Sequence, residues 1–144
     1  MKKQVFVIGL DDFNRKKLEN LPEAKNCDFH AALTIGEMRK VDNIDINAFI
    51  ELIDKRIEEN GGIDGIVSYF DFPGTTLVPI IAKKHGIPGT SLESVLKCEN
   101  KYWSRLEQSK VIPDHIPMFK AFDPFDENAF EKIEMITPYW TKPI

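Results

Sequence analysis

Acidic side chains follow two of the segments that the sequence predicts to be strands. Asp11 and Asp12 come directly after an apolar run that ends at Leu10, and Asp71 follows a later apolar run. Tyr69 lies shortly before Asp71. Because ligands gather outside the carboxyl ends of the strands in open parallel sheets, we predict that Asp71 and Tyr69 contact a substrate. The alternative is structural: Asp71 caps the turn into the helix that follows it.

The familiar motifs for binding phosphate and metal are missing from the sequence. Gly9 is the only glycine that closely follows the first predicted strand, so there is no GxGxxG turn and no GxxxxGK[ST] loop. The histidines and cysteines stand apart, without the spacing of metal ligands, at His30, His85, His115, Cys27 and Cys98. No metal site is therefore predicted, and two isolated cysteines are typical of reduced thiols in a cytoplasmic protein.

Length, charge and hydropathy exclude several classes of protein. The chain has 144 residues, 42% of them hydrophobic, and its 19 basic and 23 acidic side chains give a net charge of -4. A chain of this size can bury one real core, and its composition is that of a folded protein. It has no basic stripe for nucleic acid and no apolar run of about 20 residues for a membrane span. We therefore expect the protein to bind neither nucleic acid nor a membrane.

The order of the apolar patterns in the first part of the chain predicts alternating strands and helices. The predicted strands are the run Val5–Ile8 within Lys3–Leu10, which Gly9 bounds, and the segments Phe29–Leu33 and Ile63–Phe70. The predicted helices are one that Asp11 or Asp12 caps, one over Ile46–Asn60 and one over Thr75–His85. In the first of these helices we expect Phe13, Leu18 and Leu21 to face inward. Alternating strands and helices demand crossover connections, so we predict an α/β fold: a Rossmann-like parallel sheet flanked by helices.

The pattern changes after residue 90. Thr90 and Glu93 have the spacing of a capping box at the start of a helix. Further elements are predicted as a helix over Glu99–Ser109, a half-buried strand over Met118–Phe122, a short helix over Asn128–Ile133 and a strand that begins at Pro138. This part of the chain therefore does not continue the regular alternation that precedes it.

The stretch GIPGTSLESVLKCENKYWSRLEQSKVIPDHIPMF, residues 86–119, resembles the entry segment of the ATP-grasp ligases. In that family a turn marked by glycine and proline leads to a short helix, then to a helix led by a lysine, then to a proline before a strand. The terminal PYWTKPI resembles the family's strand that carries a second lysine. The preceding GIDGIVSYF and TTLVPIIAKKHGIPG are similar to the end of the small Rossmann-like domain that comes before the ATP-grasp fold.

This resemblance implies a division of the chain and a nucleotide site. Residues 1–90 would form the Rossmann-like pre-ATP-grasp domain, and residues 91–144 the linker helices and first strands of an incomplete α+β ATP-grasp domain. Lys101 and Lys142 match the two lysines that contact the phosphates of ATP in the family, with Lys142 also near the adenine. Ammonium groups on two separate elements can hold the charge of a triphosphate without a glycine-rich loop.

The resemblance also implies an activity. ATP phosphorylates a substrate carboxylate, an amine or another nucleophile displaces phosphate from the acyl phosphate, and Mg2+ neutralises charge on the phosphoryl group. The family's metal ligands and flexible lid follow the second lysine strand, beyond Ile144. We therefore expect the N-terminal part of a longer carboxylate–amine ligase, with no catalytic residue and no ligation of its own. The expected partners are a small-molecule carboxylate and a nucleophile, with a homodimer as one option for assembly.

Two other functions stay open. Asp11, Asp71 and Lys142 occur in the order of a phosphoacceptor receiver domain, in which an acidic cluster binds Mg2+ and Asp71 would take the phosphoryl group. The segment from Asp71 to Lys142 is longer than such a compact domain needs, since a strand–helix–strand unit takes about 30 residues. The other function is that of a non-catalytic Rossmann-like binding module.

Overall fold

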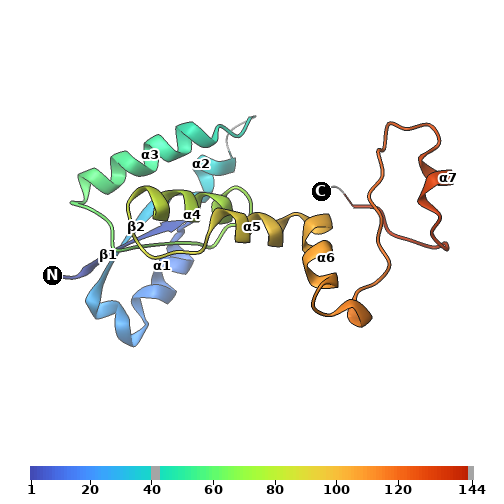
Figure 1. Cartoon of the computed structure of the whole chain (residues 1–144). Coiled ribbons are helices and arrows are strands. Elements are labelled where there is room, and N and C mark those ends of the chain that lie inside the picture. The colour runs from blue at the N-terminus through green and yellow to red at the C-terminus, as the bar shows by residue number, and fades with distance from the viewer. Residues whose placement is uncertain (40–42, 143–144) are drawn as a thin grey trace. The chain divides into compact units, whose positions relative to one another are not determined.

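The computed structural model describes residues 1–39 and 43–142, and the chain divides into two compact units, Met1–Val95 and Leu96–Ile144. The sequence places this division at residue 90. The first unit contains a parallel sheet of three strands in the order β2-β1-β3 (Figure 1). The strands are β1 (Lys3–Ile8), β2 (Cys27–Leu33) and β3 (Gly65–Ser68). The α/β fold that the sequence predicts, Rossmann-like with helices around a parallel sheet, is therefore confirmed.

Helices lie on both faces of this sheet. The helical segments of the first unit are α1 (Asp12–Glu19), the 3-10 turn η1 (Pro22–Asn26), α2 (Ile35–Arg39), α3 (Ile46–Glu59) and α4 (Gly74–Lys84). A right-handed crossover from β1 to its neighbour β2 runs in the opposite direction to the crossover from β2 to β3, so the two crossovers use opposite faces. Figure 1 shows α1 on one side of the sheet and α3 and α4 on the other.

The hydrophobic core lies between the sheet and the layer formed by α3 and α4. The apolar stripe predicted for α3 is confirmed, because Phe49, Ile53 and Ile57 are its buried residues. Sheet and helix side chains complete the core, among them Phe6, Ile8, Leu33, Leu77 and Ile81, which are fully buried. The helix begins as predicted after Asp45, whose carboxylate accepts a hydrogen bond from the backbone of Ala48.

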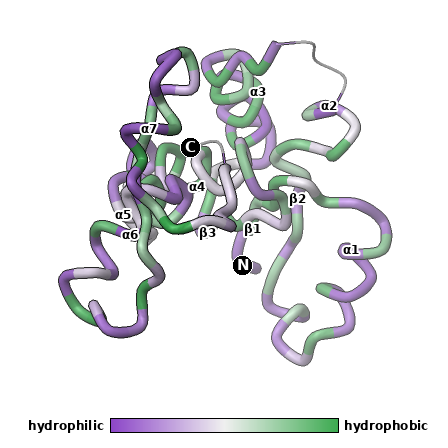
Figure 2. The backbone as a smooth tube through the Cα atoms, turned by 90° about the vertical axis from the view of Figure 1, so that its right-hand side faces the viewer, coloured by the Kyte–Doolittle hydropathy of each residue, from purple (hydrophilic) through white to green (hydrophobic). Residues whose placement is uncertain are grey.

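The orientation predicted for the first helix is wrong for two of its three apolar residues. Asp11 caps α1 through the backbone N–H of Asn14, as expected. Phe13 and Leu21, however, are 64% and 51% exposed, and α1 has no buried residue. Figure 2 shows the α1 tube mainly in the hydrophilic colour. The charged side chains of this helix favour water, and the Lys17 ammonium lies 4.3 Å from the centre of the Phe13 ring.

The second unit is built from helices and irregular segments. α5 (Leu92–Glu99) leads into it from the first unit, followed by α6 (Lys101–Ser109), the 3-10 turn η2 (Pro113–His115) and α7 (Ala129–Ile133). The cap of α5 lies one residue after the predicted Thr90, because the Ser91 hydroxyl accepts a hydrogen bond from the backbone of Ser94. α6 follows Asn100, whose side chain accepts from the backbone of Trp103.

The two strands predicted in the second unit do not form within the described residues. Met118–Phe122 and the described part of the terminal segment, Pro138–Lys142, have no sheet partner there; residues 143 and 144 lie outside the description. Alternating or β-branched residues favour a strand only where a neighbouring strand accepts their backbone hydrogen bonds.

Among the helices that the structure describes, none has the length and apolar character needed to cross a membrane.

Candidate functional site

The carboxyl ends of β1 and β3 form the topological switch point of the sheet. The chain leaves β1 toward α1 on one face, and it leaves the neighbouring β3 toward α4 on the other face. In open α/β sheets this divergence opens the crevice in which ligands bind. The loop after Ile8 and the loop after Ser68 border the switch point, and the second of them contains both substrate-contact residues predicted from the sequence, Tyr69 and Asp71.

A tight turn fixes the backbone of the loop after β3. The Ser68 hydroxyl donates a hydrogen bond to the carbonyl of Phe70 (2.6 Å) and accepts one from its backbone N–H (3.0 Å). The backbone N–H of Tyr69 donates to the carbonyl of Ile8 in β1 (3.0 Å). Phe70 packs against the core, whereas the Tyr69 side chain is 49% exposed. The turn therefore holds the main chain in place and leaves the phenol in solvent.

Asp71 begins the turn into α4 with its backbone and not with its side chain. Its carbonyl accepts hydrogen bonds from the backbone N–H groups of Gly74 (2.6 Å) and Thr75 (3.3 Å). The carboxylate is exposed and caps no backbone group of α4. The carbonyl of Asp71 therefore has the structural role that the sequence suggested for its side chain. The carboxylate is left available to a ligand.

Two glycines bring the elements of the switch point into close contact. A Cβ on Gly74 would overlap the Ser68 hydroxyl and lie 3.3 Å from the Phe70 Cβ. Gly9 has a φ of +80°, and its Cβ would lie 3.2 Å from the Phe70 Cβ and 3.6 Å from the Met38 methyl group. The ends of β1 and β3 and the helix α2 therefore meet around Phe70, where a larger residue at either glycine would separate them.

The structure adds one charged residue to this end of the sheet, Arg39, which the sequence reasoning missed. Arg39 is the last residue of α2, and its guanidinium lies 5.9 Å from the centre of the Phe70 ring. α2 forms because Thr34 and Glu37 make a capping box: the Glu37 carboxylate accepts from the Thr34 backbone N–H (2.7 Å), and the Thr34 hydroxyl accepts from the Glu37 N–H (3.2 Å). The spacing of Thr34 and Glu37 is visible in the sequence and could have predicted the helix that carries Arg39.

An ion pair holds α2 against α3. Arg56 donates to both carboxylate oxygens of Glu37, at 2.6 and 3.1 Å, and to the carbonyl of Ala32 at 2.8 Å. The hydrogen bonds from Arg56 and Thr34 outweigh the effect of burial and lower the pKa of Glu37 from 4.5 to about 2. Glu37 is therefore ionised at neutral pH, and the pair fixes the short helix that carries Arg39.

The acidic residues after β1 have other roles. The Asp11 carboxylate is engaged in capping α1, and Asp12 is an exposed residue of the first turn of that helix. Across residues 1–39 and 43–142 no group of three or more histidine, cysteine, aspartate or glutamate side chains is placed to hold a metal ion.

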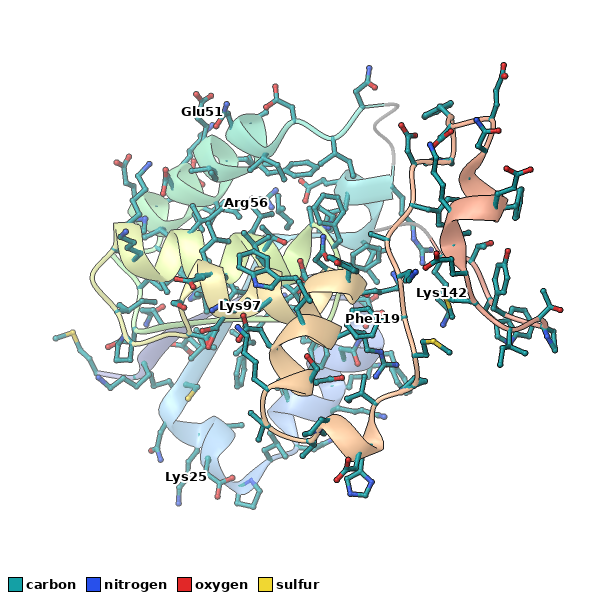
Figure 3. The ribbon with its side chains drawn as sticks, turned by 45° about the vertical axis from the view of Figure 1, so that its right-hand side comes forward. Lys25, Glu51, Arg56, Lys97, Phe119 and Lys142 are labelled. Atoms are coloured by element: carbon teal, nitrogen blue, oxygen red, sulfur yellow. The ribbon has the colours of Figure 1, made fainter. Side chains whose placement is uncertain are left out.

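Lys101 and Lys142, the two predicted phosphate contacts, are both exposed residues of the second unit. Lys101 is the first residue of α6, and Lys142 lies in a segment without regular secondary structure that also contains the 93% exposed Trp140 (Figure 3). The structure records no contact that joins the two lysines. All other lysines of this unit form ion pairs with carboxylates: Lys97 and Lys110 with Glu107, Lys120 with Glu134, and Lys132 with Asp126. Lys101 and Lys142 make no such pair within the described residues.

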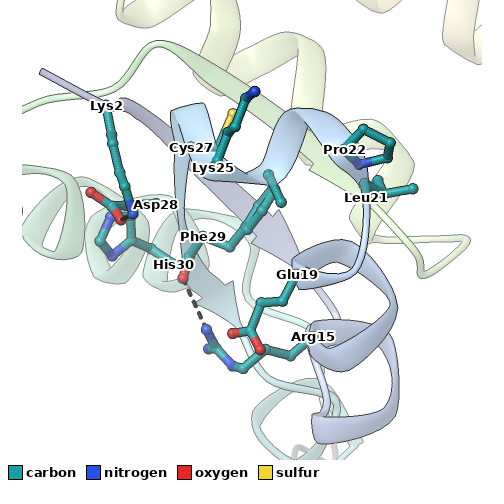
Figure 4. Close-up of a pocket in the computed structure, with 11 residues that line it drawn as sticks. Lys2, Arg15, Glu19, Leu21, Pro22, Lys25, Cys27, Asp28, Phe29 and His30 are labelled. Atoms are coloured by element: carbon teal, nitrogen blue, oxygen red, sulfur yellow. Dashed lines mark hydrogen bonds and ion pairs between the residues drawn. The ribbon is translucent and has the colours of Figure 1, made fainter.

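A shallow cavity of about 580 Å³ lies along the amino-terminal half of β2, a feature with no signal in the sequence. Its lining includes Arg15, Lys25, Cys27 and Asp28 (Figure 4). Arg15 donates to the carbonyl of Phe29 (3.0 Å), and Asp28 pairs with Lys2 (3.1 Å). Much of the polar lining is thus used in contacts within the protein.

No family model matches the chain, and it matches no curated protein and no solved structure.

Proposed function

We propose that this chain supplies the phosphate-binding lysines of an ATP-dependent carboxylate–amine ligase that works through an acyl phosphate. The observation that carries the proposal is the charge pattern of the second unit. Lys101 and Lys142, which the resemblance to the ATP-grasp ligases singles out, are the lysines of this unit that have no carboxylate partner within the described residues. A lysine whose role is to bind phosphate must be free of a competing carboxylate.

The chemistry of ATP suits two ammonium groups on separate elements. The triphosphate carries its charge along its length, and lysine provides a compact point charge on a flexible stem. Lys101 extends from the start of a helix and Lys142 from a segment without regular secondary structure. Ligand binding would bring the two groups to different phosphates, in place of the backbone N–H groups that a glycine-rich loop provides.

The proposed reaction has two steps. A carboxylate oxygen of the substrate attacks the γ-phosphorus of ATP, and ADP leaves. The nitrogen of an amine then attacks the acyl carbon, the carbon–oxygen bond to phosphate breaks, phosphate leaves, and the nitrogen loses a proton. The part of the chain that the structure describes contains no cluster of side chains that could hold Mg2+.

The first unit has the role of holding the substrate. Tyr69 and Asp71 present a phenol and a carboxylate at the switch point, which is where a small molecule binds in this kind of sheet. We also place the protein in a reducing compartment, the cytoplasm, because Cys27 and Cys98 are free thiols.

The test is the binding of ATP to the chain by isothermal titration calorimetry. We expect saturable binding, weakened at least fivefold by Lys101→Ala and by Lys142→Ala. Lys83→Ala is the matched control, because Lys83 is an exposed lysine of α4 with no ion pair in the described structure. Unchanged affinity in both variants, or an equal loss with Lys83→Ala, would contradict the assignment. No binding of ATP at all would leave a non-catalytic module as the better description.

A further inference from the structure

One cationic side chain lies at the carboxyl end of the sheet without a carboxylate partner among the residues that the structure describes. Arg39 is exposed and forms no ion pair or hydrogen bond within the described residues, whereas Arg15 and Arg56 each donate to a backbone carbonyl, and Arg105 donates to the Gln108 side chain. Its recorded contact is with an aromatic face, that of Phe70. A guanidinium that lies over a ring keeps the N–H groups at its edge free to donate to a ligand.

The helix residues that precede Arg39 are held in place by contacts. Met38, the preceding residue, is buried and reaches to within 3.6 Å of the Cβ position of Gly9. Glu37 is fixed from both sides, by the Thr34 cap and by Arg56. The start of the Arg39 side chain is therefore fixed relative to the loop after β3. A fixed starting point reduces the entropy that the side chain loses when it binds an anion.

The loop that carries Phe70 also carries a negative charge. Phe70, whose ring centre lies 5.9 Å from the guanidinium, is followed directly by Asp71, which is exposed and whose side chain forms no hydrogen bond or ion pair within the described residues. The exposed phenol of Tyr69 precedes it. The loop after β3 and the end of α2 thus present one cation, one anion and a neutral hydroxyl. A dianionic ligand would be repelled by Asp71, and a simple amine by Arg39.

We propose that the switch point binds a zwitterionic small molecule, an α-amino acid, with its carboxylate on Arg39 and its ammonium group on Asp71. A planar guanidinium recognises a carboxylate through two parallel hydrogen bonds. The inference rests on the proposed function, in which this site holds a substrate, and it specifies the class of that substrate. An amino acid can serve the ligase as the amine that attacks the acyl phosphate.

The test uses chemical-shift perturbation of the full chain by NMR, with the backbone amides of Gly9, Phe70 and Gly74 as reporters. The probes are the standard L-amino acids, succinate, inorganic phosphate and propylamine. We expect saturable shifts with at least one amino acid, and affinities at least tenfold weaker for succinate, phosphate and propylamine. Arg39→Gln should weaken amino-acid binding at least tenfold and Asp71→Asn at least fivefold. Lys25→Gln, which changes an exposed cation at the other end of β2, should have no effect.

The outcomes separate this inference from the function on which it rests. Tighter binding of phosphate or succinate than of any amino acid, or an unchanged affinity in Asp71→Asn, would overturn the zwitterion assignment. Unchanged amino-acid binding in Arg39→Gln would overturn the role of Arg39. Titration of the same Arg39→Gln sample with ATP should give the wild-type affinity. If ATP binding is lost only in the Lys101→Ala and Lys142→Ala variants, the nucleotide site is distinct from the amino-acid site.

Discussion

The two units of the chain differ most in how many of their apolar side chains are buried. In the first unit, β1 alone contributes three fully buried residues, Phe6, Val7 and Ile8. In the described part of the second unit, the buried hydrophobic residues are Ala129 and Ile133, both in α7. Large apolar side chains of the second unit are exposed instead, including Val111, Met118, Phe125, Phe130, Ile136 and Trp140.

This difference in burial indicates which unit contributes most of the free energy of unfolding. Burial of apolar surface is the main favourable term in folding, at about 25 cal/mol for each Å² removed from water. The first unit gains it through a sheet covered by α3 and α4. The second unit gains little of it and relies on helix caps and exposed ion pairs, which contribute much less. We therefore expect the free energy of unfolding to reside in residues 1–95.

Removal of the same kind of side chain from each unit should have the largest difference in effect on stability. Phe6→Ala deletes a fully buried phenyl group and should lower the free energy of unfolding by about 3 to 5 kcal/mol. Phe125→Ala deletes a phenyl group that is 92% exposed and should change it by less than about 0.5 kcal/mol. Urea unfolding followed by far-ultraviolet circular dichroism measures both values.

Tryptophan fluorescence supplies the control, because Trp103 and Trp140 both belong to the second unit. Its transition should precede the circular dichroism transition and should move little in Phe6→Ala. Coincident transitions by the two probes, or equal losses in the two alanine variants, would show that the units unfold as one and that the contrast in burial has no energetic meaning.

The sequence predicts the first unit well because its signals are periodic and its elements have partners. The stripe that includes Ile53 on α3 and the unbroken apolar run of β1 both describe faces that are covered in the structure. The same reasoning fails for Phe13 and for the strand predicted at Met118–Phe122, because apolar spacing shows which side could be buried and not whether another element covers it. Arg39 was missed for a different reason: its position depends on a five-residue helix held by a long-range ion pair.

A second, smaller effect distinguishes the kinds of ion pair in the two units. The Glu37 carboxylate, which Arg56 binds, has a pKa of about 2 in the folded protein against 4.5 ordinarily. A lowered pKa stabilises the fold fully above pH 4.5, and this contribution is lost as the pH falls toward about 2. Because the side chain of Glu37 is 35% exposed, we discount the shift for solvent screening and expect Glu37→Gln to cost about 1 to 2 kcal/mol at pH 7.

The pH dependence separates this contribution from a general effect of the substitution. The difference in unfolding free energy between wild type and Glu37→Gln should be constant from pH 7 to pH 5 and should shrink at lower pH. Glu51→Gln is the matched control, because Glu51 is an exposed glutamate of the same helix as Arg56 (Figure 3). A cost of the same size in Glu51→Gln, or a difference that grows as the pH falls, would contradict the assigned role of the Glu37–Arg56 pair.

The smallest effect is expected for the corresponding cluster of the second unit. Glu107 accepts a hydrogen bond from Lys110 (2.9 Å), lies 3.8 Å from Lys97 and accepts from the Trp103 indole (3.3 Å). The hydrogen bond from Lys110 and the nearby positive charges lower the pKa of Glu107 against a smaller opposing effect of burial. The main partner of Glu107, Lys110, is more exposed than Arg56, so Glu107→Gln should shift the urea midpoint less than Glu37→Gln does.

Trp103 makes this weak interaction measurable even though its effect on stability is small. In a Trp140→Phe background, the emission of Trp103 should change with pH as Glu107 titrates, with a midpoint below the ordinary value of 4.5 for glutamate. Lys110→Met removes the main cause of the shift and should move that midpoint upward. Addition of 0.5 M NaCl should also move it upward, because salt screens the exposed charges. A midpoint that neither change moves would mean that the cluster is not formed in solution, and the second unit would then hold even less fixed structure than its few buried side chains indicate.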